Sequence, residues 1–251
     1  MNGGIGNGLY EKRLAIIHIP QSAITEMPVY QLTDDLIFPD PQRASSRGLL
    51  AVGGDLRVER LLLAYRLGIF PWYGPGEPIL WWSPPRRCVM EPTDFHASRS
   101  LLRLMRQGRF TVTFDQAFAQ VIHACAETRL AEGQGTWIVP EMLEAYCALH
   151  EAGFAHSAET WWEGQLAGGI YGVSLGRAFF GESMFAQVTN ASKVAFFSLS
   201  QRLVEWEFTL IDCQITNPHL SRLGAYEITL REFLRRLDEA LQFPTRRGKW
   251  R

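Results

Sequence analysis

The sequence predicts a mixed α/β protein in which helices cover a mixed sheet. Hydrophobic residues make up 47% of the 251 residues and charged residues 20%, as in folded soluble proteins, so the chain can bury a sizeable core. From about residue 96 onward, segments with helical spacing of apolar residues precede three strand-like runs, which are followed by a helix, a strand and a last helix. This order is typical of an α/β or α+β domain with a mixed sheet.

The first 95 residues are divided by proline and glycine into short segments, and one helix stands out among them. Apolar residues recur at helical spacing from Val58 to Leu67. Asp55 is placed to cap this helix, and Gly68 is placed to end it. Elsewhere in this part the pattern predicts short strands at most.

The later elements follow in order along the chain. Helical spacing predicts helices over residues 98–107, 115–125 and 141–151. Strand-like runs cover residues 156–162, 165–174 and 177–181, with turns at Glu163-Gly164 and Leu175-Gly176. A helix then begins at Asn190 or Ser192, a strand covers residues 209–215, and an amphipathic helix covers residues 230–241.

These patterns divide the chain into four parts. We expect an N-terminal extension over residues 1–35, a small N-terminal domain over residues 36–95, a larger domain over residues 96–242, and a basic tail over residues 243–251.

Several classes of protein are excluded by composition. No apolar run approaches the roughly 18 residues that a membrane-spanning helix needs. The apolar stretch from Leu14 to Ile19 is too short for a signal peptide. The four cysteines are far apart and the six histidines show no ligand spacing, so neither a disulfide framework nor a metal site is expected. The sequence therefore predicts a cytoplasmic protein without a metal.

The basic residues are unusual in kind and in placement. Only three of the 25 basic residues are lysine, and arginine suits phosphate and stacked bases. Arg99, Arg103 and Arg106 share one helix face, since they fall at positions i, i+4 and i+7. A solvated helix face explains such a run. That is the usual explanation, but on a chain whose net charge is only −1 a local excess of arginine also fits a patch that binds one segment of a nucleic acid.

Two short segments carry the polar residues with chemical potential. On a strand through Ile211, Asp212 and Gln214 would point to the same face, where a carboxylate and an amide could contact an amine and a carbonyl. An edge strand with its polar face in water is the alternative. Glu182 follows a strand-like run and a glycine, among apolar residues, so it is either a pocket acid or the partner of an arginine.

Five ordered motifs together resemble a known family. They are Gly68–Trp72, Ile79–Pro84, Gly135–Ile138, Gly181–Phe185 followed by Asn190–Lys193, and Ile211–Gln214. In this order and spacing they resemble the bacterial leucyl/phenylalanyl-tRNA–protein transferases, over roughly residues 36–237.

The resemblance implies an activity and an architecture. Members of the family move leucine or phenylalanine, and less well methionine, from aminoacyl-tRNA to the N-terminal amine of proteins that begin with arginine or lysine, which marks them for N-degron degradation. They need no cofactor and no metal. Their fold is a small N-terminal domain followed by a domain like that of the acetyltransferases.

The resemblance also assigns roles to individual residues. It implies that Asp212, Gln214 and Glu182 are the polar residues of the active site and that Trp72 and Trp137 hold the terminal adenosine of the tRNA. The pocket for the aminoacyl side chain would be lined by Ile170, Phe179, Phe196, Leu199, Leu203 and Ile211. Relatives carry methionine at the position of Ile170 and phenylalanine at those of Leu199 and Leu203. The arginines at 99, 103 and 106 match the helix that binds the tRNA body.

The residue types suit the chemistry that the resemblance implies. The donor is an activated ester, so the enzyme mainly has to hold the acceptor amine against the ester carbonyl. The hypothesis from the sequence is that Asp212 accepts a hydrogen bond from the amine and Gln214 polarises the carbonyl, while Glu182 orients a charged group of donor or acceptor.

Three other functions compete with this one. An acetyl-CoA-dependent N-acetyltransferase would need a pyrophosphate loop, and the nearest match, from Gln165 to Ile170, lies inside a strand-like run. An RNA-binding or adaptor protein would leave the polar residues without a role. A glycan-binding protein built on exposed tryptophans would show no salt-sensitive affinity for tRNA.

Overall fold

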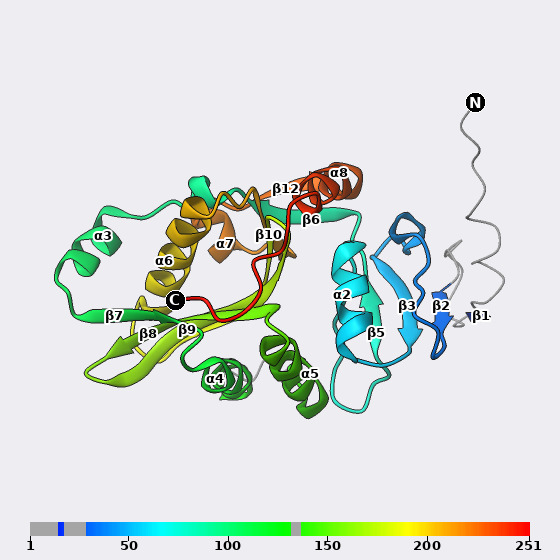
Figure 1. Ribbon diagram of the computed structural model, residues 1–251, viewed down its shortest axis with the longest axis horizontal. Coiled ribbons are helices and arrows are strands. Elements are labelled where there is room, and N and C mark those ends of the chain that lie inside the picture. Colours follow the sequence, from blue (N-terminus) through cyan, green and yellow to red (C-terminus); the bar gives the residue numbers. More distant parts are fainter. Residues whose placement is uncertain (1–14, 18–28, 132–136) are drawn as a thin grey trace.

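The computed structural model describes residues 15–17, 29–131 and 137–251, and it contains two sheets (Figure 1). Most of the predicted N-terminal extension and the segment 132–136 lie outside these residues. The smaller sheet and its helix form one end of the molecule, and the larger sheet with the remaining helices forms the other. The predicted class, a mixed α/β fold with helices over mixed sheets, is confirmed.

The smaller sheet has five short strands in the order β1-β2-β3-β5-β4. They are β1 (Ala15–Ile17), β2 (Val29–Leu32), β3 (Leu49–Gly53), β4 (Phe70–Pro71) and β5 (Leu80–Trp82). Only β2 and β3 run parallel. Trp81 is fully buried at its centre, and its indole Nε1 donates to the carbonyl oxygen of Gly53 at 2.9 Å. The short 3₁₀-helix η2 (Pro41–Arg43) lies between β2 and β3, and another, η3 (Pro92–Asp94), follows later in the chain, before residue 96.

Helix α2 (Val58–Arg66) packs beside this sheet, and its start differs from the prediction. Its N-cap residue is Arg57, and no side chain caps the helix. Asp55 instead accepts from the backbone N–H of Arg57 at 3.1 Å and pairs with the buried Arg60 at 3.2 Å. The helix ends as expected, because Gly68 adopts a φ of 72° just beyond it.

The larger sheet has seven strands in the order β12-β6-β11-β10-β9-β8-β7. They are β6 (Arg86–Met90), β7 (Phe110–Phe114), β8 (Ala155–Trp162), β9 (Gln165–Leu175), β10 (Ala178–Ala186), β11 (Leu210–Gln214) and β12 (Tyr226–Thr229). Strands β7 to β10 form an antiparallel meander, and the pair β10–β11 is parallel. The predicted strands correspond to β8, β9, β10 and β11, while β6, β7 and β12 are additional.

Helices cover both faces of this sheet. They are α3 (Arg99–Arg106), α4 (Phe118–Ala131), α5 (Pro140–Glu151), α6 (Ala191–Glu205), α7 (Pro218–Arg222) and α8 (Leu230–Leu241). Helix α6 packs on β8 and β9 over one hydrophobic cluster, and α4 and α5 pack on the sheet within a second, larger one (Figure 1). Helix α4 begins three residues later than predicted, because Asp115 has a φ of 54° and belongs to the turn before it.

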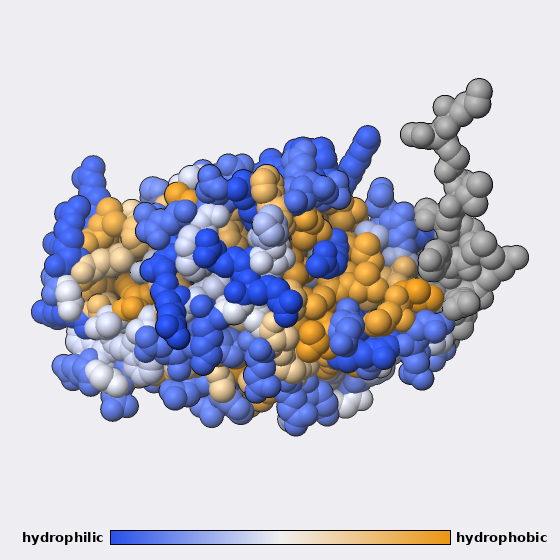
Figure 2. All heavy atoms as spheres, viewed as in Figure 1, coloured by the Kyte–Doolittle hydropathy of each residue, from blue (hydrophilic) through white to orange (hydrophobic). Residues whose placement is uncertain are grey.

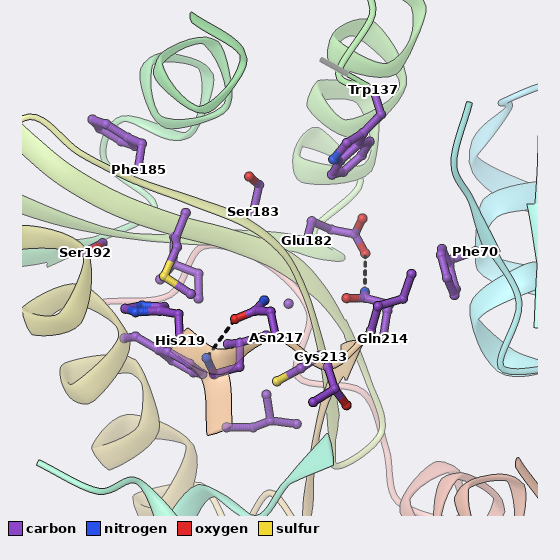
Figure 3. A pocket seen from close by; sticks show the side chains of 18 of the residues that line it. Phe70, Trp137, Glu182, Ser183, Phe185, Ser192, Cys213, Gln214, Asn217 and His219 are labelled. Carbon is purple, nitrogen blue, oxygen red and sulfur yellow. Dashed lines mark hydrogen bonds between the residues drawn. The ribbon is translucent and has the colours of Figure 1, made fainter. Parts of the chain in front are cut away.

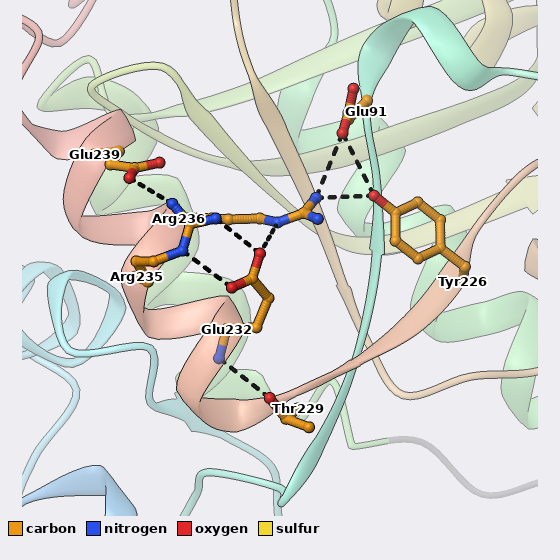
Figure 4. A network of polar contacts seen from close by, with 7 residues as sticks. All are labelled: Glu91, Tyr226, Thr229, Glu232, Arg235, Arg236 and Glu239. Carbon is orange, nitrogen blue, oxygen red and sulfur yellow. Dashed lines mark hydrogen bonds and ion pairs between the residues drawn. The ribbon is translucent and has the colours of Figure 1, made fainter.

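Helix α8 is fastened to the sheet by a network of charged side chains (Figure 4). Arg236 pairs with Glu232 at 2.8 Å and with Glu91, just beyond β6, at 3.4 Å, and it donates to the hydroxyl of Tyr226 at 2.8 Å. Each exposed pair contributes little alone. Together they set the position of α8, whose apolar side chains, Phe233 among them, are buried against the sheet.

The predicted basic tail has an apolar anchor. Trp250 is only 2% exposed, stacks on the His156 ring at a centroid distance of 3.8 Å, and donates its backbone N–H to Asp115 at 2.6 Å. In the view of Figure 2 hydrophilic residues follow the path of the tail, while apolar residues gather over α2 and the smaller sheet.

Candidate active site

A cavity of about 740 Å³ lies where the two sheets approach each other, a size suited to a small-molecule ligand or to the end of a larger one. Its wall is formed by β4, β10, β11, the N-terminus of α6 and α7. The lining residues include Phe70, Trp72, Trp137, Ile170, Glu182, Met184, Ser192, Phe196, Ile211, Cys213, Gln214, Thr216, Asn217 and His219. Figure 3 shows Glu182 and Gln214 next to each other, with Trp137 above Glu182 and Phe70 beside them.

Glu182 is held in this wall by three donors from different parts of the chain. It lies at an irregularity of β10, between Gly181 and Ser183, where the register shifts by one residue. Its carboxylate accepts from the hydroxyls of Tyr65 at 2.8 Å and Tyr146 at 3.0 Å. The two hydroxyl groups also lie within hydrogen-bonding distance of each other, but each has a single proton, so neither donates to the other while both donate to Glu182. Burial raises the pKa of Glu182 to about 7, although the tyrosine hydrogen bonds act in the opposite direction.

Gln214 is the third contact of this carboxylate. The orientation of Gln214 is fixed by hydrogen bonds from its side chain and from its backbone. Its Nε2 donates to Oε1 of Glu182 at 3.2 Å, and its backbone N–H donates to Oδ1 of Asp212 at 3.0 Å (Figure 3). The residue has a φ of 54°, in the left-handed region. Its amide oxygen has no hydrogen-bond partner among the residues that the structure describes, so it can accept a hydrogen bond from a ligand in the cavity.

Asp212 lies behind this wall and does not line the cavity. It is fully buried, and its two carboxylate oxygens accept from Nε of Arg87 at 2.8 Å and from Nη2 of Arg87 at 2.6 Å. Simple alternation would place Asp212 and Gln214 on one face. The register shifts between them, and Cys213 and Gln214 both line the cavity. The bulge therefore separates the two residues that spacing brings together.

The two tryptophans assigned from motifs are both in the cavity wall. Trp72 is 41% exposed and comes from the rim next to β4, where its carbonyl oxygen accepts from Nε1 of Trp82 at 2.7 Å. Trp137 precedes α5. Gly135 and Thr136 of the same motif lie outside the described residues. Two indole rings on one cavity are suited to stacking on a flat ligand.

The six residues expected to form an apolar pocket divide into two groups. Ile170, Phe196 and Ile211 line the cavity. Phe179, Leu199 and Leu203 are fully buried beneath them in the hydrophobic cluster under α6, where Phe179 also contacts Trp250. The first group can therefore contact a ligand in this structure, and the second forms the packing below it.

The arginines expected to contact nucleic acid lie away from the cavity. Arg99, Arg103 and Arg106 are exposed on α3. None of the three forms an ion pair within the described part of the chain. Their guanidinium groups are therefore available to phosphates.

Sequence reasoning missed three residues of the site, namely Tyr65, Tyr146 and Arg87. Tyr65 lies on α2 and Tyr146 lies on α5. A buried tyrosine hydroxyl usually has a hydrogen-bond partner, which is the one signal that pointed to these two. Arg87 gave none, because a charged residue on a buried strand breaks the expected pattern. Cys213, inside the motif Ile211–Gln214, is mostly buried and also forms part of the cavity wall.

The thiol of Cys213 is not activated. Its hydrogen bond with Cys88 and its burial raise its pKa well above the ordinary value of a thiol. A nucleophilic thiolate is therefore not expected at this site. Among residues 15–17, 29–131 and 137–251 there is no cluster of histidine, cysteine and carboxylate side chains that could hold a metal ion, and no helix long and apolar enough to cross a bilayer.

Comparison with known proteins gives one family over most of the chain. The family model described as leucyl/phenylalanyl-tRNA protein transferase matches residues 89–238, and the model of that family's N-terminal domain matches residues 54–85. A leucyl/phenylalanyl-tRNA–protein transferase from Desulfatibacillum aliphaticivorans is 59% identical over 224 residues, which cover 89% of this chain and 96% of the relative. A relative of the same name from Myxococcus xanthus is 55% identical over 226 residues, which cover 89% of this chain and 97% of the relative.

Solved structures resemble the chain only distantly. The structure of L-PGS from Bacillus licheniformis aligns with 80% of this chain and 66% of that chain at 13% identity, with a TM-score of 0.38. An aminoglycoside acetyltransferase from a soil metagenomic sample covers 44% of this chain and 80% of its own at 13% identity, with a TM-score of 0.35. These scores carry no argument about activity.

Proposed function

Because this chain belongs to the leucyl/phenylalanyl-tRNA–protein transferase family, we propose that it transfers leucine or phenylalanine, and less well methionine, from aminoacyl-tRNA to the N-terminal α-amine of proteins that begin with arginine or lysine. The product is a protein longer by one residue and marked for N-degron degradation. Aminoacyl-tRNA is a cytoplasmic substrate, so the proposed site of action is the cytoplasm.

The reaction needs no external source of energy. The nitrogen of the acceptor amine attacks the ester carbonyl carbon, the bond from that carbon to the ribose oxygen breaks, and a proton passes from the amine to the ribose oxygen. The ester is already activated, and an α-amine has a pKa near 8, so part of it is neutral at pH 7. The enzyme must chiefly position the two reactants, which can supply about 7–11 kcal/mol.

The free amide oxygen of Gln214 is the observation that supports a mechanism best. Its amide nitrogen is engaged by Glu182, so the oxygen is the group left to contact substrate. In the proposal it accepts a hydrogen bond from the attacking amine and so holds the nitrogen lone pair towards the ester. This replaces the role that the sequence suggested for Asp212, whose oxygens are engaged by Arg87 and by the backbone of Gln214.

The remaining walls suit the donor. In the proposal Trp72 and Trp137 stack on the terminal adenosine, while Ile170, Phe196 and Ile211 contact the aminoacyl side chain. Phe179, Leu199 and Leu203 set how deep that side chain can enter, since they form the packed layer below. The arginines of α3 would bind phosphates of the tRNA body.

A transfer assay tests the proposal. Purified protein is mixed with radiolabelled Phe-tRNA or Leu-tRNA and with peptides that begin with arginine, lysine or alanine. We expect label on the arginine and lysine peptides and none on the alanine peptide. Gln214→Ala should lower kcat by about a hundredfold while the protein still binds Phe-tRNA, because the amine is no longer positioned.

The other outcomes separate the competing functions. Binding of tRNA without transfer to any peptide would indicate an RNA-binding protein. Acetyl transfer from acetyl-CoA to an amine would indicate an N-acetyltransferase. Transfer by Gln214→Ala at the wild-type rate would remove Gln214 from the mechanism.

A further inference from the structure

We propose that Arg87 is a positioning residue of the transfer reaction, which holds Gln214 in place through Asp212 and connects it to the cavity-lining Phe70. This inference rests on the proposed function. Arg87 lies in β6, is fully buried, and does not line the cavity. It therefore acts on the reaction only through its neighbours.

Arg87 and Asp212 form a bidentate pair, or fork. The guanidinium donates through Nε and Nη2 to the two carboxylate oxygens, at 2.8 and 2.6 Å, and both side chains are fully buried. A bidentate pair fixes the plane and rotation of the carboxylate as well as its distance. Lysine supplies the charge without this geometry.

Asp212 in turn holds the backbone of Gln214. The carboxylate oxygen that accepts from Nε of Arg87 also accepts from the backbone N–H of Gln214 at 3.0 Å. That residue has a φ of 54° at a bulge, a conformation that residues other than glycine seldom adopt without support. The fixed carboxylate provides the support. A carboxylate free to rotate would release the strand end that carries the amide.

Arg87 also contacts both parts of the molecule. Its guanidinium lies between two phenyl rings, 4.7 Å from the centroid of Phe70 and 4.4 Å from that of Phe233. Phe70 belongs to the smaller sheet and lines the cavity, and Phe233 belongs to α8. The fit is tight, because a Cβ at Gly68 would lie 2.7 Å from the Phe233 ring. A ligand that moves Phe70 would therefore press on the side chain that orients Gln214.

The hydrogen bonding of the Arg87 guanidinium is incomplete. Its Nη1 is buried and has no hydrogen-bond partner within the described residues. A buried N–H group without a partner is costly, so stability alone does not explain this arrangement. The two rings and the fork together favour one orientation of the guanidinium.

The charge of Arg87 gives the experiment a second readout. Glu182 faces Tyr65 on α2, Tyr146 on α5, Gln214 and Asp212 on β11, and Arg87 on β6. Of the two buried charges, Arg87 lowers the pKa of Glu182 and Asp212 raises it. Arg87→Lys retains the charge, whereas Arg87→Met removes it and should raise that pKa.

The experiment compares three variants with the wild type. Arg87→Lys and Arg87→Met test the fork and the charge. The control is Arg60→Met, because Arg60 is also fully buried and also paired with an aspartate, Asp55, but lies outside the cavity wall. We measure kcat and KM for Phe-tRNA and for an arginine peptide, per folded molecule as determined by circular dichroism, from about pH 6 to 9.

If Arg87 positions Gln214, the variants should show a specific pattern of kinetic changes. Arg87→Lys should lose about a hundredfold in kcat with KM for Phe-tRNA unchanged, since a shift of the amide by one ångström suffices for such a loss. The acidic limb of its pH profile should stay in place. Arg87→Met should move that limb to higher pH. Arg60→Met should melt at a lower temperature and keep its kcat.

Other results would overturn the proposal. If the wild type transfers and Arg87→Lys is equally fast, or if Arg60→Met loses kcat to the same extent, Arg87 has no positioning role. If Arg87→Lys does not fold, the neutral pair Arg87→Met/Asp212→Asn decides, because it leaves no unpaired buried charge, and a wild-type kcat would again overturn the proposal. Absence of transfer by the wild type would instead refute the proposed function itself.

Discussion

Glu182 combines a partly buried position with three hydrogen-bond donors, and this governs when it carries a charge. Burial raises its pKa to about 7, so the group changes its ionisation near neutral pH. Only the ionised carboxylate accepts freely from all three donors. Its protonation would weaken the contact that orients the Gln214 amide.

Activity should therefore increase with pH around neutrality. As pH rises through about 7, Glu182 ionises and Gln214 becomes fixed, while the acceptor amine, with a pKa near 8, loses its proton. Single-turnover rates with Phe-tRNA measured against pH should show two ionisations. In Glu182→Gln the ionisation near pH 7 should be absent, and the ionisation of the acceptor amine should remain. Persistence of both in this variant would show that the first belongs to another group.

The same pKa predicts an effect on stability of opposite sign. In the folded state the carboxyl has a pKa of about 7 instead of 4.5, so the folded protein binds more protons than the unfolded chain between these values. The contribution of Glu182 to stability thus falls as pH rises from about 4.5 to about 7. Urea denaturation should show that the stability of Glu182→Gln relative to the wild type is higher at pH 8 than at pH 4.5 by about 3 kcal/mol. An equal difference at both pH values would contradict the raised pKa.

At the scale of elements, the proposed function gives α3 a separate task from the cavity. Its three arginines are exposed and unpaired within the described residues, and each contact with a phosphate releases counterions. Replacing Arg99, Arg103 and Arg106 by alanine should raise KM for Phe-tRNA by about tenfold or more. The slope of log affinity against log salt concentration should become shallower by about three, because about three phosphate contacts are lost. The kcat at saturating tRNA should stay unchanged.

A basic residue elsewhere provides the control for α3. Arg235 is exposed on α8 but is paired with Glu232 and Glu239. Arg235→Ala should leave the affinity for tRNA and its salt dependence unaltered. Equal losses in both variants would point to a general effect of charge.

The elements also show what the sequence could and could not predict. Helix α8 matches residues 230–241 because its apolar stripe is regular, and α3 lies within the predicted range 98–107. Strand β6 was missed because Arg87 interrupts its buried pattern. The wall formed by Glu182 and Gln214 was found from motifs, but the bulge at Cys213, which places Asp212 behind that wall, depends on pairing with β6 and is not encoded in local spacing.

At the scale of the whole molecule, the tail joins segments that are far apart. Trp250 contacts the rings of His156, Phe179, Trp206 and Phe208, and so closes the hydrophobic cluster under α6. Trp250→Ala should cost about 3–5 kcal/mol of unfolding free energy, as expected for truncating a buried aromatic side chain. Chemical denaturation measures this directly.

Another aromatic residue of the tail provides a comparison. Phe243 is 40% exposed and lies under the guanidinium of Arg177. Phe243→Ala should cost less than about 1 kcal/mol. If the two substitutions had equal effects, the tail would be attached by its whole length and not by Trp250.

The hydrogen bonds of Glu182 have a consequence for how the protein reaches its active form. Tyr65 is 117 residues distant from Glu182 in the chain, and Gln214 is 32 residues distant. Contacts between such remote segments form late in folding, because closing long loops is slow. A nascent or refolding chain can thus acquire most of its helices and strands before Glu182 has its partners Tyr65 and Gln214. In the proposed mechanism such a chain would be inactive until the smaller sheet with α2 has docked on the larger one.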